Sequence, residues 1–423
     1  MVLGKIMNKT KNWMIFIFMV LPIIYLILGY YFQTSFFTLL SVYGILVLLH
    51  LFFQMFFAAI NNKKQQYKTS KDYFPTISVV VPTYNEGYHD LKECLFSIGK
   101  QNYPKFDVYL VDDGTETNHS ELVYKEFKRT FPKIPIFYHH SAKNQGKRFA
   151  QKWAFDKLTS ELVVTIDSDT ELLPTTIYEL TRPFYDQKVG AATGNVRGKN
   201  KYKRILTQLI DLRYWMAFNQ ERASQSLFGV TMCVCGVLGA YRTSILKNIK
   251  EKYVAQTFLG HICNFGDDRH LSNLVLNEGY NIYYTPKAKA YTDVPETLWK
   301  WLKQQLRWNK SFYREILWNV PSIKKHSLYL GMELFYQAFI PFFLLLNLIL
   351  YTVKGINVDL RFILLYFTIM INIALLRTIY PLYKTKDIGF VMFPIYALLH
   401  IFLLLPIRLI ALATLGFNGW GTR

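Results

Sequence analysis

The sequence is short of acidic residues and cysteine, and it contains no internal repeat or low-complexity segment. Its 29 Asp and Glu residues are set against 49 Lys and Arg, giving a formal net charge of +20 at pH 7. The four cysteines are Cys94, Cys233, Cys235 and Cys263. Cys233-Val234-Cys235 lacks zinc-site spacing and has no His pair nearby, so no metal site is expected there. The excess of positive charge suits a protein held against anionic lipid.

Apolar residues, in contrast, are abundant. They make up 51% of the chain, and mean hydropathy is positive at +0.12. The excess lies at the two ends of the chain. Trp13–Tyr31 and Phe36–Ile60 are each long enough to cross a hydrocarbon core of about 30 Å. A cleaved signal peptide is disfavoured, because a second span follows the first and no small-residue cleavage site separates them.

The C-terminal third repeats this pattern. Candidate spans are Tyr329–Val353, Leu360–Tyr380 and Ile388–Leu415. The last of these contains Pro394, Pro406 and Arg408, so it could be broken, doubled or re-entrant.

Basic residues flank the N-terminal spans. Lys5, Lys9 and Lys11 precede the first span, and Lys63, Lys64, Lys68 and Lys71 follow the second. Because positive charge concentrates on the cytoplasmic side, the two spans are expected to form a hairpin in a multi-pass cell-membrane protein. The expected organisation is a transmembrane hairpin at 1–60, a cytoplasmic domain at 61–296, an interfacial amphipathic helix at 297–320 and a C-terminal membrane region at 321–423. A nucleic-acid partner is not expected, because the chain has a membrane and α/β pattern.

The cytoplasmic segment has the pattern of an α/β domain. Ile77–Pro82, Val108–Val111 and Leu162–Ile166 are apolar, β-branched runs, and Asp90–Lys100 and Gly146–Leu158 are helix-length segments between them. Strands alternating with helices predict a parallel sheet with right-handed crossovers. Ligands of such sheets bind beyond the carboxyl ends of the strands, where these three runs all end in carboxylates or polar turn residues.

Asp167-Ser168-Asp169 follows the third run. Alternate residues at a strand end point the same way, so both carboxylates can face one site. Two close carboxylates repel each other unless a cation or proton lies between them, and Mg²⁺ suits such a pair and also binds a diphosphate. The alternative is a solvated turn, since Asp and Ser are common turn residues.

Other candidates follow the neighbouring runs. Asp112-Asp113-Gly114 could accept hydrogen bonds from a base or ribose, and Thr83, Tyr84 and Glu86 could complete a nucleotide pocket. Lys147 and Arg148 begin a predicted helix, where cations and backbone N–H groups hold phosphates. Each set also has a purely structural alternative. The segment with Thr83, Tyr84 and Glu86 could be a capped strand-to-helix turn, and Lys147 and Arg148 could belong to a solvated basic turn.

Gly266-Asp267-Asp268-Arg269 precedes another helical stretch. Transfer of a sugar needs a base that deprotonates the acceptor hydroxyl, and Asp268 is the favoured candidate with Asp267 beside it. Asp at a helix start is also a common N-cap, and one residue could cap while the other reacts.

A long amphipathic helix is predicted from Thr297 to Trp318. One face carries Lys300, Lys303, Arg307, Lys310 and Arg314, and the other is apolar, as in a helix lying in a membrane interface. On this pattern Arg307 could face lipid and Trp308 could belong to an aromatic belt. Gln304 and Trp308 lie one turn apart at the boundary between the faces, where the indole could stack on a sugar and Gln304 could donate a hydrogen bond. Arg197–Gln225, with Arg204, Arg213 and Arg222, is a second candidate interfacial segment.

These motifs, taken as a set, resemble those of the family-2 processive glycosyltransferases, which include cellulose, chitin and hyaluronan synthases. The set is Asp112-Asp113-Gly114, Asp167-Ser168-Asp169, Gly266-Asp267-Asp268-Arg269 and Gln304-x-x-Arg307-Trp308. Within that family the chain is most similar to the class I bacterial hyaluronan synthases, through Gln256-Thr257-Phe258-Leu259-Gly260, Thr292-Asp293-Val294-Pro295 and the terminal Trp420-Gly421-Thr422-Arg423, among other segments.

The resemblance implies a GT-A-like nucleotide-sugar-binding α/β domain with flanking transmembrane helices. It implies that Asp113 and the turn at 83–86 bind uridine, that Asp167 and Asp169 hold Mg²⁺ or Mn²⁺ and the diphosphate, and that Asp268 is the base. Gln304, Arg307 and Trp308 would position the acceptor sugar and the nucleotide. The implied partners are UDP-GlcNAc, UDP-GlcA, the growing polysaccharide and membrane lipid, and the reaction is single displacement with inversion. Resemblance also places the terminal Trp420–Arg423 on the cytoplasmic side.

One segment departs from the hyaluronan synthase pattern. Those enzymes usually carry Ser-Gly-Pro where this chain has Cys235-Gly236-Val237, and Met232–Gly236 is more similar to chitin-oligosaccharide synthases. A chitin-oligosaccharide synthase or another β-linked capsule polysaccharide synthase therefore stays open as an alternative. From a different class, so does a polysaccharide transporter with a nucleotide-binding domain, although a transporter has no need of Asp268.

Overall fold

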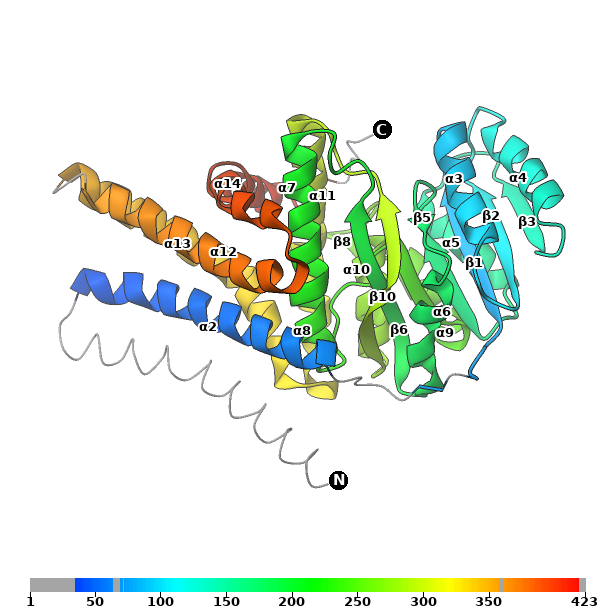
Figure 1. Cartoon of the computed structure of the whole chain (residues 1–423), viewed down its shortest axis with the longest axis horizontal. Helices are drawn as coiled ribbons and strands as arrows, with labels where there is room; N and C mark the ends of the chain where they lie inside the picture. The colour runs from blue at the N-terminus through cyan, green and yellow to red at the C-terminus, as the bar shows by residue number, and fades with distance from the viewer. Residues whose placement is uncertain (1–34, 64–68, 71, 358–360, 418–423) are drawn as a thin grey trace, which may run out of the picture.

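The computed structural model describes residues 35–63, 69–70, 72–357 and 361–417 (Figure 1). The expected span at Trp13–Tyr31 and the terminal segment at Trp420–Arg423 lie outside the described residues. The described chain has two regions. An α/β domain built on one large sheet lies at one end, and long helices extend from it at the other.

Eight strands form the central sheet in the order β3-β2-β1-β4-β7-β6-β10-β5. In chain order they are β1 Ile77–Thr83, β2 Phe106–Asp112, β3 Ile136–His140, β4 Leu162–Ile166, β5 Glu171–Leu172, β6 Val189–Gly198, β7 Leu238–Arg242 and β10 Asn281–Thr292. The first four strands are parallel, which confirms the expected arrangement for the three apolar runs. The expectation of a wholly parallel sheet is wrong, because β7 runs antiparallel to β4 and β6, and β5 antiparallel to β10. Apolar patterning identifies a buried strand but carries no signal for its direction.

Helices cover both faces of this sheet. Their buried apolar side chains divide into two clusters, one on each face. One cluster includes residues of α3 Tyr88–Gly99, α4 His119–Thr130 and α6 Thr176–Thr181, and the other includes residues of α5 Lys147–Lys157, α9 Thr243–Val254 and α10 Asp267–Asn277. The expected helices at Asp90–Lys100 and Gly146–Leu158 are therefore confirmed as α3 and α5. A short 3₁₀ helix, η1 Arg182–Tyr185, and a small hairpin, β8 Thr257–Phe258 and β9 His261–Ile262, complete the domain.

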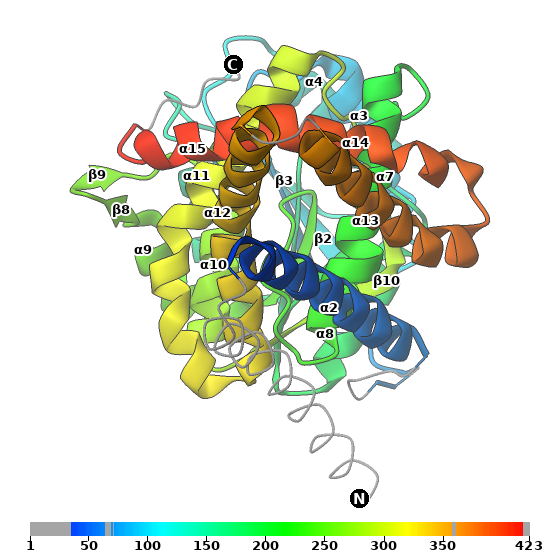
Figure 2. The same ribbon diagram turned by 90° about the vertical axis from the view of Figure 1, so that its left-hand side faces the viewer.

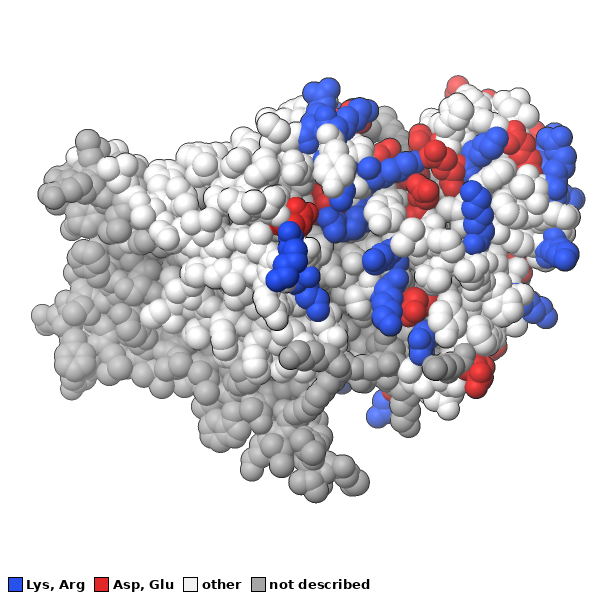
Figure 3. Space-filling model, in the orientation of Figure 1, with Lys and Arg blue, Asp and Glu red and all other residues white. Residues whose placement is uncertain are grey.

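The long helices are α2 Ser35–Lys63, α12 Leu328–Asn357 and α13 Arg361–Thr385 (Figure 1). Three segments of the described chain are long and apolar enough to cross a membrane: Tyr43–Asn62, Leu328–Val353 and Ile388–Ala413. The expected span at Leu360–Tyr380 is helical as α13, but it contains Arg361 and Arg377 and is not one of those three. In the view of Figure 3 the described part of the surface over the long helices carries few charged side chains, whereas Lys, Arg, Asp and Glu gather over the α/β domain.

The segment Ile388–Ala413 is broken, as its prolines suggested. It consists of the 3₁₀ helix η3 Ile388–Met392, α14 Phe393–Leu399, the π-helix η4 His400–Leu404 and α15 Leu405–Ala413. Figure 2 shows α14 and α15 following one another across the ends of α12 and α13 rather than running beside them. The segment therefore does not fold back on itself as two passes.

Two further helical segments stand between the sheet and the long helices, on opposite sides in Figure 2. One is α7 Ile205–Met216, continued by the π-helix η2 Ala217–Arg222 and by α8 Ala223–Ser226. The other is α11 Leu298–Lys325, which begins as expected, with the Thr297 hydroxyl capping the Lys300 N–H.

The basic face of α11 is not exposed along its whole length. Lys310 and Arg314 are buried. The Arg314 Nε donates to the Leu415 carbonyl oxygen at 2.9 Å, and the Lys310 Nζ donates to the Phe417 carbonyl oxygen at 3.4 Å. These carbonyls follow the end of α15, where helical carbonyls lack intrahelical partners, so the two cations bind the chain as it leaves the helix.

Candidate active site

One cavity of about 1210 Å³ joins the carboxyl ends of the strands to the long helices. It is lined by the turns after β1, β2 and β4, by the starts of α5 and α10, and by α7 and α11. It continues between α2, α12, α13 and the crosswise segment Ile388–Ala413. Every residue expected at the site except Asp112 lines this cavity: Thr83, Tyr84, Glu86, Asp113, Lys147, Arg148, Asp167, Asp169, Asp267, Asp268, Gln304, Arg307 and Trp308. The structure thus brings together residues more than 200 positions apart in the sequence.

Asp112 and Asp113 separate because successive side chains of a strand point to opposite faces. Asp113 lines the cavity, and its two carboxylate oxygens accept the backbone N–H groups of Gln145 and Gly146 at 3.0 and 2.7 Å. Asp112 is fully buried and accepts the Thr115 N–H at 2.9 Å. Its expected substrate contact is therefore corrected to a role in holding the turn.

Asp167 and Asp169 follow β4, as the pattern predicted. Burial, together with the charges of Asp167 and Glu86, raises the pKa of Asp169 to about 7. Glu86 accepts a hydrogen bond from Ser168 at 2.8 Å, and Asp169 accepts one from Thr292 at 3.2 Å. Such crowding of carboxylates favours a bound cation.

The number of carboxylates at this position limits the kind of divalent ion that they could bind. No group of three or more His, Cys, Asp or Glu side chains with metal-ligand geometry occurs among the described residues. Mg²⁺ typically uses one or two carboxylates and takes its other ligands from water and substrate phosphates. Asp167 and Asp169 therefore suit an ion that binds together with a diphosphate.

Lys147 and Arg148 begin α5 but face in different directions, because successive helical residues are rotated by about 100°. The Lys147 Nζ lies 2.5 Å from Asp167 and 3.2 Å from Asp267, and these two acids, working against burial, raise its pKa well above the usual value. Arg148 is 5% exposed and donates to the carbonyl oxygens of Tyr253 and Phe265. Arg148 thus supports the chain that leads into Asp267, and its contact with a phosphate stays a prediction.

Asp267 and Asp268 open α10, but the N-cap is Gly266, in a left-handed conformation at φ 85°. A Cβ at this position would collide with Ser311 of α11, so the loop carrying the two acids packs directly on that helix. Burial raises the pKa of Asp268 and so does the charge of Asp267, whereas Lys147 and Arg148 outweigh burial and lower the pKa of Asp267. The two neighbouring carboxyls thus differ, and Asp268 is the better proton acceptor.

The helix α11 contributes Gln304, Arg307 and Trp308 to the lining of the cavity. Gln304 has a buried side-chain oxygen with no hydrogen-bond partner in the described chain, and it lines the cavity. Trp308 is 44% exposed and its ring centroid lies 6.4 Å from that of Tyr214 on α7. The indole therefore faces the cavity as well as its mouth, which suits a sugar-stacking side chain better than a lipid-facing one.

Sequence reasoning missed Cys233 and Thr292 as members of the site. The Cys233 Sγ lies 3.6 Å from Asp268 Oδ2, and Thr292 binds Asp169 as described above. Burial and the charge of Asp268 raise the pKa of the Cys233 thiol, so the thiol stays protonated and donates to the carboxylate. Cys233 had been considered for metal spacing and as part of a segment similar to chitin-oligosaccharide synthases, without a contact to Asp268, and Thr292 had entered only as part of a resemblance.

Arg213 and Arg222, expected at a membrane interface, also line the cavity. The Arg213 Nη1 pairs with Glu221 at 2.9 Å, and the Arg222 Nε donates to the Cys233 carbonyl oxygen at 3.2 Å. The interfacial interpretation of this segment is therefore wrong for these two residues, which line the cavity instead.

The fold is that of GT-A glycosyltransferases. A mannosyltransferase from Pyrobaculum calidifontis, solved in complex with GDP-Man and Mn²⁺, matches with a TM-score of 0.60 and 20% identity. The match covers 86% of this chain and 98% of that one. The described structure is thus a GT-A-like mixed α/β domain with long apolar helices.

Sequence comparison identifies the family. The chain is 34% identical to hyaluronan synthase from Streptococcus pyogenes over 425 residues, covering 99% of this chain and 98% of that one. It is also 34% identical to an N-acetylglucosaminyltransferase from Neorhizobium galegae, over 82% of this chain and 80% of that one. The model of the glycosyltransferase-like family 2 matches residues 75–311. The chain therefore belongs to the family-2 glycosyltransferases.

Proposed function

We propose that the protein is a processive, inverting glycosyltransferase that polymerises UDP-GlcNAc and UDP-GlcA into hyaluronan and exports the polymer across a cell membrane. The likeness to a hyaluronan synthase along nearly the full length of both chains supports this product. The observation that carries the proposal is the cavity, which runs without interruption from the carboxylates at the sheet edge to the space between the apolar helices.

Donor binding falls to the turns after the parallel strands. Thr83, Tyr84, Glu86 and Asp113 would surround the uridine, and Asp167 and Asp169 would hold Mg²⁺ or Mn²⁺ with the diphosphate. Like the Pyrobaculum enzyme, which was solved with Mn²⁺, the site would use the ion to neutralise charge on the leaving nucleotide. Lys147 lies beside Asp167 and would add a positive charge close to the diphosphate.

Asp268 would act as the base. Its raised pKa and its place at the start of α10 suit removal of a proton from the acceptor hydroxyl. The hydroxyl oxygen then attacks the anomeric carbon of the donor as the bond to UDP breaks, which inverts an α-linked donor to a β-linkage. Asp267 would stay ionised beside Lys147 and would not compete for the proton.

The acceptor end of the polymer would lie against α11. The Trp308 indole would stack on a sugar ring, and Gln304, whose buried oxygen has no partner, would accept a hydrogen bond from a sugar hydroxyl. Arg307 lines the same stretch of the cavity and would complete the contact with the donor.

Export would follow the cavity between the helices. We place the catalytic domain, 61–296, in the cytoplasm, with the α11 segment 297–320 at the membrane surface and the regions 1–60 and 321–423 in or against the membrane. With α12 and α13 as a hairpin and Ile388–Ala413 lying crosswise, the chain end returns to the cytoplasmic side, as the resemblance implied.

The product is tested by incubating purified protein with Mg²⁺ and UDP-GlcNAc and UDP-GlcA, separately and together, and then digesting the product with hyaluronan lyase. We expect long, lyase-sensitive polymer only when both donors are present. Long polymer from either donor alone would overturn the two-substrate proposal.

A chitin-oligosaccharide synthase is the second candidate. Met232, Cys233, Cys235 and Gly236 line the cavity close to the carboxylates, and this segment is the one that departs from the hyaluronan synthase pattern. The similarity to the Neorhizobium N-acetylglucosaminyltransferase points the same way. Short, chitinase-sensitive product from UDP-GlcNAc alone would favour this candidate.

A further inference from the structure

Charge is unevenly distributed along the cavity. Near the sheet, its lining carries the acidic side chains Glu86, Asp113, Asp167, Asp169, Asp267, Asp268 and Asp293. Toward the long helices its lining carries Arg213, Arg222, Arg377 and Arg408, and the one acid among the lining residues there is Glu221. The helical half of the cavity therefore has an excess of positive charge.

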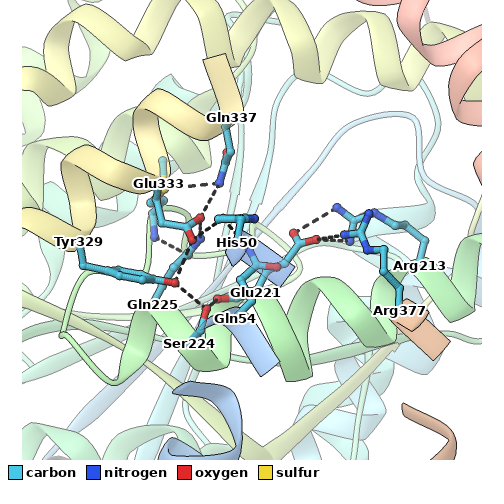
Figure 4. A network of polar contacts seen from close by, with 11 residues as sticks. His50, Gln54, Arg213, Glu221, Ser224, Gln225, Tyr329, Glu333, Gln337 and Arg377 are labelled. Carbon is cyan, nitrogen blue, oxygen red and sulfur yellow. Dashed lines mark hydrogen bonds and ion pairs between the residues drawn. The ribbon is translucent and has the colours of Figure 1, made fainter. Parts of the chain in front are cut away.

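Three of these arginines come from elements that are distant in the sequence. Arg213 lies on α7, Arg377 on α13 and Arg408 on α15. Glu221, on η2, lies between two of them, 2.9 Å from the Arg213 Nη1 and 3.8 Å from the Arg377 Nη2 (Figure 4). Burial opposes ionisation of Glu221, but Arg213 and Arg377 outweigh it and lower its pKa.

The third guanidinium is not neutralised. Arg408 has no carboxylate partner within the described part of the chain, and the nearby Arg213 repels it. Arg213, Arg377 and Arg408 line the cavity, as does His400 of η4. The Nε of Arg377 is also buried and has no hydrogen-bond partner among the residues that the structure describes.

The opposite wall is different in character. Gln54 of α2, Gln225 of α8 and Gln337 of α12 line it, and Gln225 and Gln337 donate to Glu333 at 3.3 and 3.2 Å (Figure 4). Glu333 also accepts a hydrogen bond from Tyr329 at 2.8 Å and lies 3.0 Å from His50. On this wall Glu333 accepts the hydrogen bonds of the neighbouring amides. On the arginine wall, in contrast, some N–H donors have no partner within the described chain, and positive charge exceeds negative charge.

Unpaired guanidinium groups among apolar helices are costly, and they are kept where they bind a charged substrate or line an ion path. A neutral polymer could offer them hydroxyl oxygens but no compensating charge. A carboxylate offers the charge and accepts the paired N–H groups of a guanidinium in a bidentate arrangement. Glu221 already binds Arg213 through both carboxylate oxygens, at 2.9 and 3.1 Å, and lies 3.8 Å from Arg377, so it occupies the position that such an anion would take.

We propose that Arg213, Arg377 and Arg408 form a carboxylate-binding site for the uronate residues of the growing polysaccharide, with Glu221 as the internal carboxylate that the polymer displaces. This inference rests on the proposed function and deepens it, because it makes an acidic polymer the occupant of the helical half of the cavity. It also assigns the two walls different tasks, with the arginines binding acidic sugars while the amides face the neutral ones.

The test measures binding of a hyaluronan octasaccharide and a chitin octasaccharide to purified full-length protein, with Arg377→Gln, Arg408→Gln and Glu221→Gln variants. Because hydrogen bonds to charged groups are strong, each arginine variant should bind the hyaluronan octasaccharide roughly tenfold or more weakly and bind the chitin octasaccharide unchanged. Glu221→Gln should bind the hyaluronan octasaccharide more tightly than wild type. Arg408→Lys, which keeps the charge, should recover part of the lost affinity.

Arg204→Gln is the matched control, since Arg204 is exposed at the start of α7 and does not line the cavity. It should bind both oligosaccharides as wild type does. If an arginine variant fails to fold, the Glu221→Gln variant and the salt dependence of wild-type binding still test the inference. Salt screening should lower the affinity for the hyaluronan octasaccharide and leave that for the chitin octasaccharide unchanged. Equal affinity of wild type, Arg377→Gln and Arg408→Gln for the hyaluronan octasaccharide would overturn the inference. If that happens while wild type still makes lyase-sensitive polymer, the proposed function stands and only this inference fails.

Discussion

The two halves of the cavity solve opposite electrostatic problems. At the sheet edge, carboxylates crowd together, and the pKa of Asp169 rises to about 7 because burial and two neighbouring acids disfavour its charge. Between the helices, guanidinium groups crowd together, and Glu221 alone among the lining residues offsets them. The first half requires a cation and suits a metal with a nucleotide diphosphate. The second requires an anion and suits an acidic product.

On the proposed function, one cavity holds both the reaction and the path of the polymer. Chemistry at the sheet edge depends on a few side chains held at fixed positions by strand ends and helix starts. On the proposed function, the helical half needs only groups that bind a repeating unit and release it. Substitutions in the first half should therefore change rates sharply, and those in the second should change affinity and product length.

The largest expected effect is that of Asp268→Asn. Removing the base should lower kcat by roughly 10²- to 10⁴-fold and leave the KM for each UDP-sugar close to wild type. The measurement is UDP release under saturating donors. Asp156→Asn, at a surface ion pair with Lys152 and Lys250, is the matched control and should retain activity. Retention of wild-type sugar incorporation in Asp268→Asn would show that the base is elsewhere.

Metal removal tests whether the carboxylates at the sheet edge bind a divalent ion. Chelation by EDTA should abolish activity, and Mg²⁺ or Mn²⁺ should restore it. In Asp169→Asn the Mg²⁺ concentration for half-maximal activity should rise at least roughly tenfold. Even substitutions of the groups that support metal ligands lower metal affinity by about that factor. Titration of UDP release with Mg²⁺ measures this. Full activity of the wild-type enzyme in EDTA would rule out the metal role of the carboxylate pair.

The pH profile tests the pairing of Asp267 with Asp268. Asp268 must be ionised to act as the base, and its raised pKa means that activity falls, as pH decreases, at a higher pH than an ordinary carboxyl would give. In Asp267→Asn the neighbouring negative charge is gone, so the pKa of Asp268 falls and activity persists to lower pH. The acidic limb of kcat should move down by on the order of one pH unit. If the acidic limb does not move, the group that controls it is not Asp268.

The smallest expected effect concerns Trp308. Trp308→Ala removes a sugar-stacking surface worth about 1 kcal/mol, so the KM for an oligosaccharide acceptor should rise several-fold with little change in donor KM. Trp299→Ala is the matched control, because Trp299 lies on the same helix, is 67% exposed and does not line the cavity. Equal effects of the two substitutions would return Trp308 to the role of a membrane-interface aromatic.

The sheet-edge half could be predicted from the sequence because its signals are local. Asp167 and Asp169 follow an apolar, β-branched run, and the two-residue period of a strand places both carboxylates on one side. Asp112 was misjudged although the same period applies, because the end of β2 fixes which of two successive acids points inward. The start of α5 raises a similar difficulty, since its direction decides that Lys147, rather than Arg148, contacts Asp167 and Asp267.

The helical half could not be predicted in this way. Both arginines were visible in the sequence, but Arg213 was interpreted as part of an interfacial segment, and Arg408 only as a sign that its own segment could be broken. Arg213, Arg377 and Arg408 meet only because α7, α13 and α15 pack around one space, and periodicity within each helix contains no information about the others. The fold of the α/β domain was thus accessible from pattern, whereas the site between the helices depended on tertiary packing.

The most direct test of the account uses sealed inverted membrane vesicles containing the protein, supplied from outside with Mg²⁺, UDP-GlcNAc and radiolabelled UDP-GlcA. A path from the sheet edge through the helical half predicts that completed polymer accumulates inside the vesicles and resists external hyaluronan lyase until detergent is added. Polymer that is formed at the same rate but stays fully sensitive to external lyase would contradict the account, because synthesis would then end on the side where it begins.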